Sequence, residues 1–187
     1  YRKSDGTIGT NKRAERIQKL SSIPSPYLSG VFNKIMKANS NEQWIGLWET
    51  NRGCPFTCAF CDWGSSTHNQ MYMYDIERLH NEVEWFAEHK IKFILCADSN
   101  FGIMPRDIDL VKYVTKIKQA RGYPHALSVQ TTKNATEQSY IVGKILSDAG
   151  LNKGISLSLQ SVDPTTLKNI NRSNISTETF QELQHRF

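Results

Sequence analysis

The sequence lacks several features that define other classes of protein. No stretch approaches the roughly 18 consecutive apolar residues that a membrane-spanning helix needs, and the polar first residues do not resemble a cleavable signal peptide. There is no internal repeat and no low-complexity tract. Although the net charge is +5, Lys and Arg are scattered without a run of five or more. These absences argue against a membrane span and do not favour a nucleic-acid partner, and small anionic substrates explain the positive charge equally well.

The length and composition fit one well-packed globular domain. The chain has 187 residues, of which 39% are hydrophobic and 22% charged. In residues 1–43, Pro24 and Pro26 favour an extended path, so we expect an N-terminal extension or interdomain linker with one short helix near residues 31–37. Residues 44–187 are the expected core. The chain does not begin with Met, which suggests a processed product or a piece of a longer protein.

From residue 44 onward, apolar runs that predict strands alternate with segments of helical spacing. The runs lie at residues 44–48, 93–97, 126–129 and 155–159. The segments with helical spacing lie at residues 76–86, 110–117 and 140–148, and Asp163 and Ser176 are expected to cap two further helices. Such alternation predicts a parallel sheet with right-handed crossovers. Because the chain stops after the fourth unit, a closed eight-unit barrel is excluded, and we expect further strands downstream.

Each predicted strand ends abruptly in polar residues. The polar segments lie at residues 49–53, 98–102, 130–134 and 160–161. Ligands of parallel α/β folds bind at the carboxyl ends of the strands. The pattern therefore predicts one shared active site.

Three of the four cysteines lie in one short loop, at Cys54, Cys58 and Cys61. Iron–sulfur clusters are usually held by four thiolates, so three thiolates suggest a cluster with one open iron. An open coordination position is typical of catalytic metal sites. Because these cysteines are poorly placed to pair with one another, a reducing, cytoplasmic setting is expected.

Three other interpretations of the cysteine loop are a zinc site, a ferredoxin-type cluster and chance clustering. A zinc site would add a second knuckle or histidines at set spacing, and His68 is the only histidine nearby. A ferredoxin would supply a fourth cysteine, and the one candidate, Cys96, lies within a predicted strand, where a buried and inert thiol is expected. Chance clustering is the third interpretation.

The C-x3-C-x2-C loop at residues 54–61 resembles the cluster loop of the radical S-adenosylmethionine (SAM) enzymes. The resemblance implies an open partial (β/α)6 barrel, here truncated after about four β/α units. It implies that Cys54, Cys58 and Cys61 hold a [4Fe–4S] cluster whose free iron chelates SAM. An electron from the cluster would then release a 5′-deoxyadenosyl radical that abstracts hydrogen from a small-molecule substrate. A flavodoxin- or ferredoxin-type protein would donate the electron.

The resemblance also assigns SAM contacts. Phe60 stands where the family packs an aromatic ring on the adenine, with ordinary core packing as the alternative. Asp98 and Asn100 lie in a segment similar to the Asp-x-Asn-Phe variant of the cobalamin-binding branch, with helix or turn capping as the alternative for Asp98. Gln130 matches a polar residue at the end of the third strand that often contacts SAM.

A further set of contacts comes from the later part of the chain. Ser158-Leu159-Gln160-Ser161 and Asn171-Arg172 are similar to the Gly-x-Gln-Ser…Asn-Arg pattern of the elongator-type members. In those members, the residue that corresponds to Gln160 reaches toward the ribose or methionine part of SAM. The residue that corresponds to Arg172 pairs with the SAM carboxylate. A solvated Arg172 and a turn-forming Ser161 are the alternatives, and Ser158 replaces the usual Gly.

Two segments resemble members with an N-terminal cobalamin-binding domain. These are residues 61–64 at the exit of the cysteine loop and residues 23–30 in the linker. The Asp-x-His-x-x-Gly motif of that domain is absent, so this chain is either the excised catalytic part, with cobalamin bound by a domain outside it, or a form without cobalamin. A tRNA-modifying methylthiotransferase-like enzyme and a non-catalytic electron-transfer protein remain alternatives. The substrate and the reaction outcome are not predicted.

Overall fold

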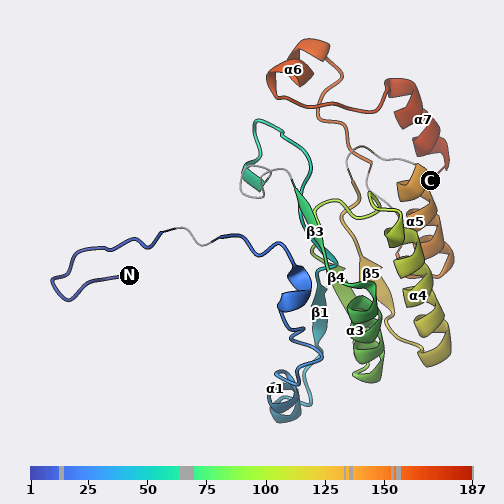
Figure 1. Cartoon of the computed structure of the whole chain (residues 1–187). Helices are drawn as coiled ribbons and strands as arrows, with labels where there is room; N and C mark the ends of the chain where they lie inside the picture. Colours follow the sequence, from blue (N-terminus) through green and yellow to red (C-terminus); the bar gives the residue numbers. More distant parts are fainter. Residues whose placement is uncertain are drawn as a thin grey trace.

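The centre of the molecule is a three-stranded parallel sheet. The computed structural model describes residues 1–12, 15–63, 70–132, 134, 137–152, 154 and 157–186. The strands lie in the order β1–β4–β5 (Figure 1), and their bounds are β1 (Ile45–Trp48), β4 (Phe93–Cys96) and β5 (Ala126–Ser128). Trp48 pairs with Cys96, and Leu95 pairs with Ser128. All three strands were predicted from their apolar runs, and their parallel pairing places their carboxyl ends at one edge.

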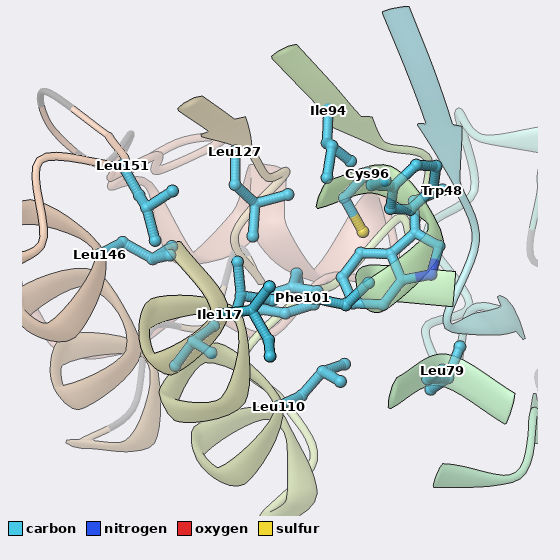
Figure 2. Packing of buried hydrophobic residues seen from close by; sticks show 14 of the residues in the cluster. Trp48, Leu79, Ile94, Cys96, Phe101, Leu110, Ile117, Leu127, Leu146 and Leu151 are labelled. Atoms are coloured by element: carbon cyan, nitrogen blue, oxygen red, sulfur yellow. The ribbon is translucent and has the colours of Figure 1, made fainter. Parts of the chain in front are cut away.

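Three helices cover one face of this sheet. They are α3 (Ile76–Glu88), α4 (Arg106–Arg121) and α5 (Glu137–Asp148), which lie side by side in Figure 1. Alternate strand residues point to them because successive side chains of a strand face opposite sides. Figure 2 shows Trp48, Ile94 and Leu127 packed among helix residues and Phe101. Cys96 is 1% exposed within this core, which confirms the prediction of a buried thiol.

The opposite face of the sheet is apolar and open among the described residues. Ile45 and Leu47 on β1 are 63% and 59% exposed, and Phe93 and Leu95 on β4 are 36% and 38% exposed. In both strands, exposed and buried residues alternate strictly. The sheet is therefore covered by helices on one side only, as in an open α/β layer.

The fourth predicted strand, at residues 155–159, is not found in the described chain. Ile155 and Ser156 lie outside the described residues, and Leu157–Leu159 is not assigned to a strand. The chain contacts β5 before the predicted strand begins, at Leu151, whose carbonyl accepts the Leu127 N–H at 2.9 Å. An apolar run alone could not distinguish a paired strand from a segment that leaves the sheet. Within the described residues, three of the four predicted strands are thus present.

Two short helices follow, as the capping residues predicted. In α6 (Pro164–Asn169), the Asp163 carboxylate accepts the Thr166 N–H at 2.7 Å. Ahead of α7 (Thr177–Arg186), the Ser176 hydroxyl accepts the Thr179 N–H at 3.1 Å. Such caps satisfy N–H groups that the first helical turn leaves unpaired. Phe187, expected on the apolar face of α7, lies outside the described residues.

The second half of the N-terminal segment docks on the core. It holds η1 (Leu20–Ser22) and α1 (Asn33–Ala38), the latter close to the helix expected near residues 31–37. The ring of Tyr27 packs 5.0 Å from that of Trp85 and 4.6 Å from that of Phe86. The first residues extend away from the sheet (Figure 1). Within the described ranges, no helix has the length and apolarity to cross a membrane.

Candidate active site

A small hairpin that the sequence did not reveal frames the cysteine loop. It pairs β2 (Asn51–Gly53) with β3 (Met71–Met73) in antiparallel register, so that Gly53 faces Met71. Gly53 has φ of +121°, and a Cβ placed on it would lie 2.0 Å from the Gln70 carbonyl oxygen. Cys54 therefore leaves the sheet through a backbone position that requires glycine.

Asp98, at the carboxyl end of β4, holds the start of this hairpin. Its carboxylate accepts the Thr50 and Asn51 N–H groups at 2.8 and 3.2 Å, the Asn51 side-chain amide at 2.7 Å, and the Thr50 hydroxyl. The residue is 1% exposed. The Asp98 carboxylate thus binds both backbone and side-chain donors of Thr50 and Asn51.

Burial raises the pKa of Asp98 to about 6, and hydrogen bonds from Thr50 and Asn51 oppose the rise only in part. The folded pKa exceeds the ordinary value of 3.8, so the folded state holds the proton more tightly. This contribution to stability is present below pH 4 and is lost as the pH rises through 6. In the unaltered chain, this effect should lower the free energy of unfolding by up to about 3 kcal/mol between pH 4 and 6. We expect Asp98→Asn to abolish this decrease.

Urea unfolding of the metal-free chain at several pH values measures this slope. Asp5→Asn is the matched control, because a hydrogen bond from the Thr7 hydroxyl lowers the pKa of the exposed Asp5 and moves its titration below this window. An Asp98→Asn slope equal to that of the unaltered chain would show that Asp98 does not titrate there.

The two residues after Asp98 contact the entry to the cysteine loop. The Ser99 hydroxyl donates to the Gly53 carbonyl at 2.8 Å, and the Asn100 side-chain amide donates to Cys54 Sγ at 3.2 Å. Asn100 is 2% exposed. Residues 98–100 therefore contact successive positions of the segment from Thr50 to Cys54. These contacts are possible because β1 and β4 end at the same edge of the sheet.

The apex of the loop is held by the segment that follows α6. The Ala59 N–H donates to the Ile170 carbonyl at 2.8 Å, and the Asn171 side-chain amide donates to the Thr57 carbonyl and hydroxyl at 3.0 and 2.7 Å. Arg172 donates from Nη1 to Cys58 Sγ at 3.5 Å. Segments more than 100 residues apart in the sequence thus meet around one thiol.

The end of α6 explains why asparagine precedes this arginine. Asn171 has φ of +50°, its N–H bonds the Lys168 carbonyl, and the Arg172 N–H bonds the Leu167 carbonyl. This is the left-handed C-terminal turn that glycine or asparagine usually forms. It directs Arg172, which is 6% exposed, inward, so the alternative of a solvated Arg172 is wrong.

The other predicted contacts are accessible. Phe60 is 53% exposed, so it is not a core residue. Gln130 and Gln160 are exposed, and the Gln130 carbonyl accepts the Phe101 N–H at 2.8 Å. Ser161 accepts the Asp163 N–H at 3.1 Å and so forms the turn that was its alternative. A bridge between Phe101 and Thr131 brings the ends of β4 and β5 together.

The residues present fit an iron–sulfur cluster. None of the four cysteines forms a disulfide, and Cys54 and Cys58 are partly buried whereas Cys61 is exposed. Two of the three loop sulfurs receive side-chain N–H donors, and the buried Nε of Arg172 has no hydrogen-bond partner among the residues that the structure describes. No three His, Cys, Asp or Glu side chains in the described ranges are arranged to hold a single metal ion. A cluster does not require that arrangement, because each thiolate binds a different iron.

The family follows from comparison with known proteins. The model of the radical SAM superfamily matches residues 48–184, which include the cysteine loop and the segment after α6. The chain belongs to the radical SAM superfamily. The family predicted from the three cysteines is therefore confirmed.

Two curated relatives are similar to this radical SAM chain over most of its length, and one of them is named as cobalamin-dependent. The 2-(S-pantetheinyl)-carbapenam-3-carboxylate methyltransferase of Streptantibioticus cattleyicolor is 41% identical over 176 residues, which are 93% of the chain and 26% of the relative. The cobalamin-dependent radical SAM methyltransferase TokK of Streptomyces tokunonensis is 39% identical over 178 residues, 94% of the chain and 26% of the relative. The chain thus spans about a quarter of each relative's length.

Solved structures of radical SAM enzymes share the fold. The methyltransferase TsrM of Kitasatospora setae matches with a TM-score of 0.63 at 16% identity, over 80% of this chain and 29% of that one. The cobalamin-dependent enzyme OxsB matches with a TM-score of 0.59 at 18% identity, over 100% of this chain and 27% of that one. The fold is therefore an α/β fold of the radical SAM type.

Proposed function

We propose that this chain is the catalytic core of a radical SAM enzyme and that its reaction is a cobalamin-linked methyl transfer to a small organic molecule. The observation that carries the proposal is the cysteine loop itself, held at its entry by Asn100 and at its apex by Arg172. The names of the two curated relatives support methyl transfer. Cyclisation and oxidation are alternative outcomes of the same radical chemistry.

In this proposal Cys54, Cys58 and Cys61 hold a [4Fe–4S] cluster. When bound, the cluster supplies the electron that cleaves SAM reductively. Three thiolates leave one iron open for SAM, whereas a cluster dedicated to electron transfer is usually ligated by four cysteines. Cobalamin would bind to a domain outside this chain. A low-potential flavodoxin or ferredoxin is the proposed electron donor.

We assign the SAM site to the residues around the loop. Phe60, Gln130 and Gln160 are exposed, so a ligand at the sheet edge could reach their side chains. Asn100 and Arg172 border the loop, and the partnerless Nε of Arg172 is a spare buried donor for a carboxylate. Asp98 contributes by fixing the loop, because its oxygens are occupied by Thr50 and Asn51.

Anaerobic reconstitution with iron and sulfide tests the proposal. We expect the reduced chain to show the EPR signal of a [4Fe–4S] cluster, and we expect SAM to change that signal because it binds the open iron. S-adenosylhomocysteine, which lacks the sulfonium methyl group, is a control for the specificity of the change. An EPR spectrum that SAM leaves unaltered would favour the electron-transfer alternative and contradict the proposed function.

A further inference from the structure

Two side chains donate N–H groups to the sulfur atoms of the cysteine loop. Asn100 Nδ2 lies 3.2 Å from Cys54 Sγ, and Arg172 Nη1 lies 3.5 Å from Cys58 Sγ. The donors come from different parts of the chain, 46 and 114 residues away from their cysteines. The sulfur atoms of Cys54 and Cys58 therefore each have their own donor, and the two donors come from separate structural elements.

Both donors are buried and fixed by neighbours. Asn100 is 2% exposed, and its amide also donates to the Ser99 hydroxyl at 3.1 Å. Arg172 is 6% exposed, and its Nη2 donates to Asn134 Oδ1 at 3.3 Å. The Arg172 guanidinium also lies 5.1 Å from the centre of the Phe56 ring. The hydrogen bonds to the two sulfurs are partly buried, and hydrogen bonds in a lower dielectric are stronger than exposed ones.

We infer that Asn100 and Arg172 are positioning residues for the cluster thiolates, which orient Cys54 and Cys58 and raise the reduction potential of the bound cluster. The inference rests on the proposed function. Reduction adds one electron from an external low-potential donor and forms no new bond. Hydrogen bonds to the sulfurs withdraw electron density and so stabilise the reduced, more negative state.

The geometry separates this role from SAM binding. The donors reach sulfur atoms of the protein itself, so their effect on the cluster does not depend on SAM. Arg172 adds a positive charge beside Cys58, and a nearby charge is weakly screened when it is buried. We therefore expect Arg172 to shift the potential more than Asn100 does.

Redox titration of the reconstituted cluster without SAM, followed by EPR, tests the inference. Asn100→Ala and Arg172→Met should each lower the ratio of reduced to oxidised cluster several-fold at a fixed potential. The double variant should lower it about tenfold, which equals about 59 mV for a one-electron couple. Asn100→Gln and Arg172→Lys keep a donor of altered reach and should give intermediate reduction potentials. These two variants test the inference if Asn100→Ala and Arg172→Met lose the cluster.

Asn171→Gly is the matched control. It keeps the left-handed turn and Arg172 in place, but it removes the side-chain contacts with Thr57, which reach no sulfur. It should leave the potential unchanged. If Asn100→Ala and Arg172→Met retain the cluster at the potential of the unaltered chain, or if they lose it and Asn100→Gln and Arg172→Lys retain it at that potential, the inference is wrong although the proposed function stands. If the unaltered chain binds no cluster, the proposed function itself fails.

Discussion

Cys58→Ala should give a folded chain that retains no [4Fe–4S] cluster and cleaves no SAM. Two remaining thiolates cannot hold three irons of the cluster, and the alanine also leaves Arg172 Nη1 without its sulfur acceptor. The iron and sulfide content after reconstitution, and the yield of 5′-deoxyadenosine, measure the loss. We expect both to fall to background, because SAM binding requires the cluster.

Cys96→Ala is the control for this prediction. Cys96 is 1% exposed between β1 and β5, and burial raises the pKa of its thiol well above the ordinary value. Its removal leaves only a small cavity, so we expect a loss of roughly 1 kcal/mol in unfolding free energy and an unchanged iron content. Loss of iron from Cys96→Ala would contradict the assignment of the three loop cysteines as the ligands.

Gly53→Ala should disrupt the cysteine loop without touching a ligand. An alanine Cβ would lie 2.0 Å from the Gln70 carbonyl oxygen, so the β2–β3 pair would have to separate. A strained backbone position alone costs on the order of 1–3 kcal/mol, and the clash adds to it. We expect a large fall in Tm and in iron retention, measured by thermal unfolding and by iron content after reconstitution.

Gly122→Ala isolates the effect of backbone strain. Gly122 ends α4 with φ of +80°, and an added Cβ would meet no atom within 4 Å. It should cost only about 1 kcal/mol and leave the iron content intact. Equal effects of the two substitutions would show that the close approach of β3 to Gly53 does not control the loop.

The helices and the three parallel strands were predictable because each element carries a periodic apolar pattern. The helix starts at Asp163 and Ser176 were also predictable, because a capping side chain acts within three residues of its own position. The β2–β3 hairpin was not predictable. Its two strands have three residues each, of which Asn51–Gly53 is polar and Met71–Met73 is too short an apolar run to indicate a strand. The two strands also pair across the whole cysteine loop.

The site was predictable in its ligands and less so in the residues around them. The spacing of the cysteines is a local property, and the polar strand ends place Asp98 and Asn100 near them. The direction of a side chain depends on distant neighbours, however. No local pattern shows that the Asp98 carboxylate turns to Thr50, or that the turn after α6 directs Arg172 to Cys58. The SAM contacts of Phe60, Gln130 and Gln160 stay predictions.

The contact between Asn171 and Thr57 has a consequence for folding kinetics. It joins residues 114 positions apart, whereas Asn100 and Cys54 are 46 positions apart. The entropy of closing a loop rises with its length, so the apex of the cysteine loop is fixed after its entry. A contact made late contributes little to the folding transition state, and its loss mainly accelerates unfolding. We therefore expect Asn171→Gly, which removes this contact, to accelerate unfolding with little effect on the folding rate.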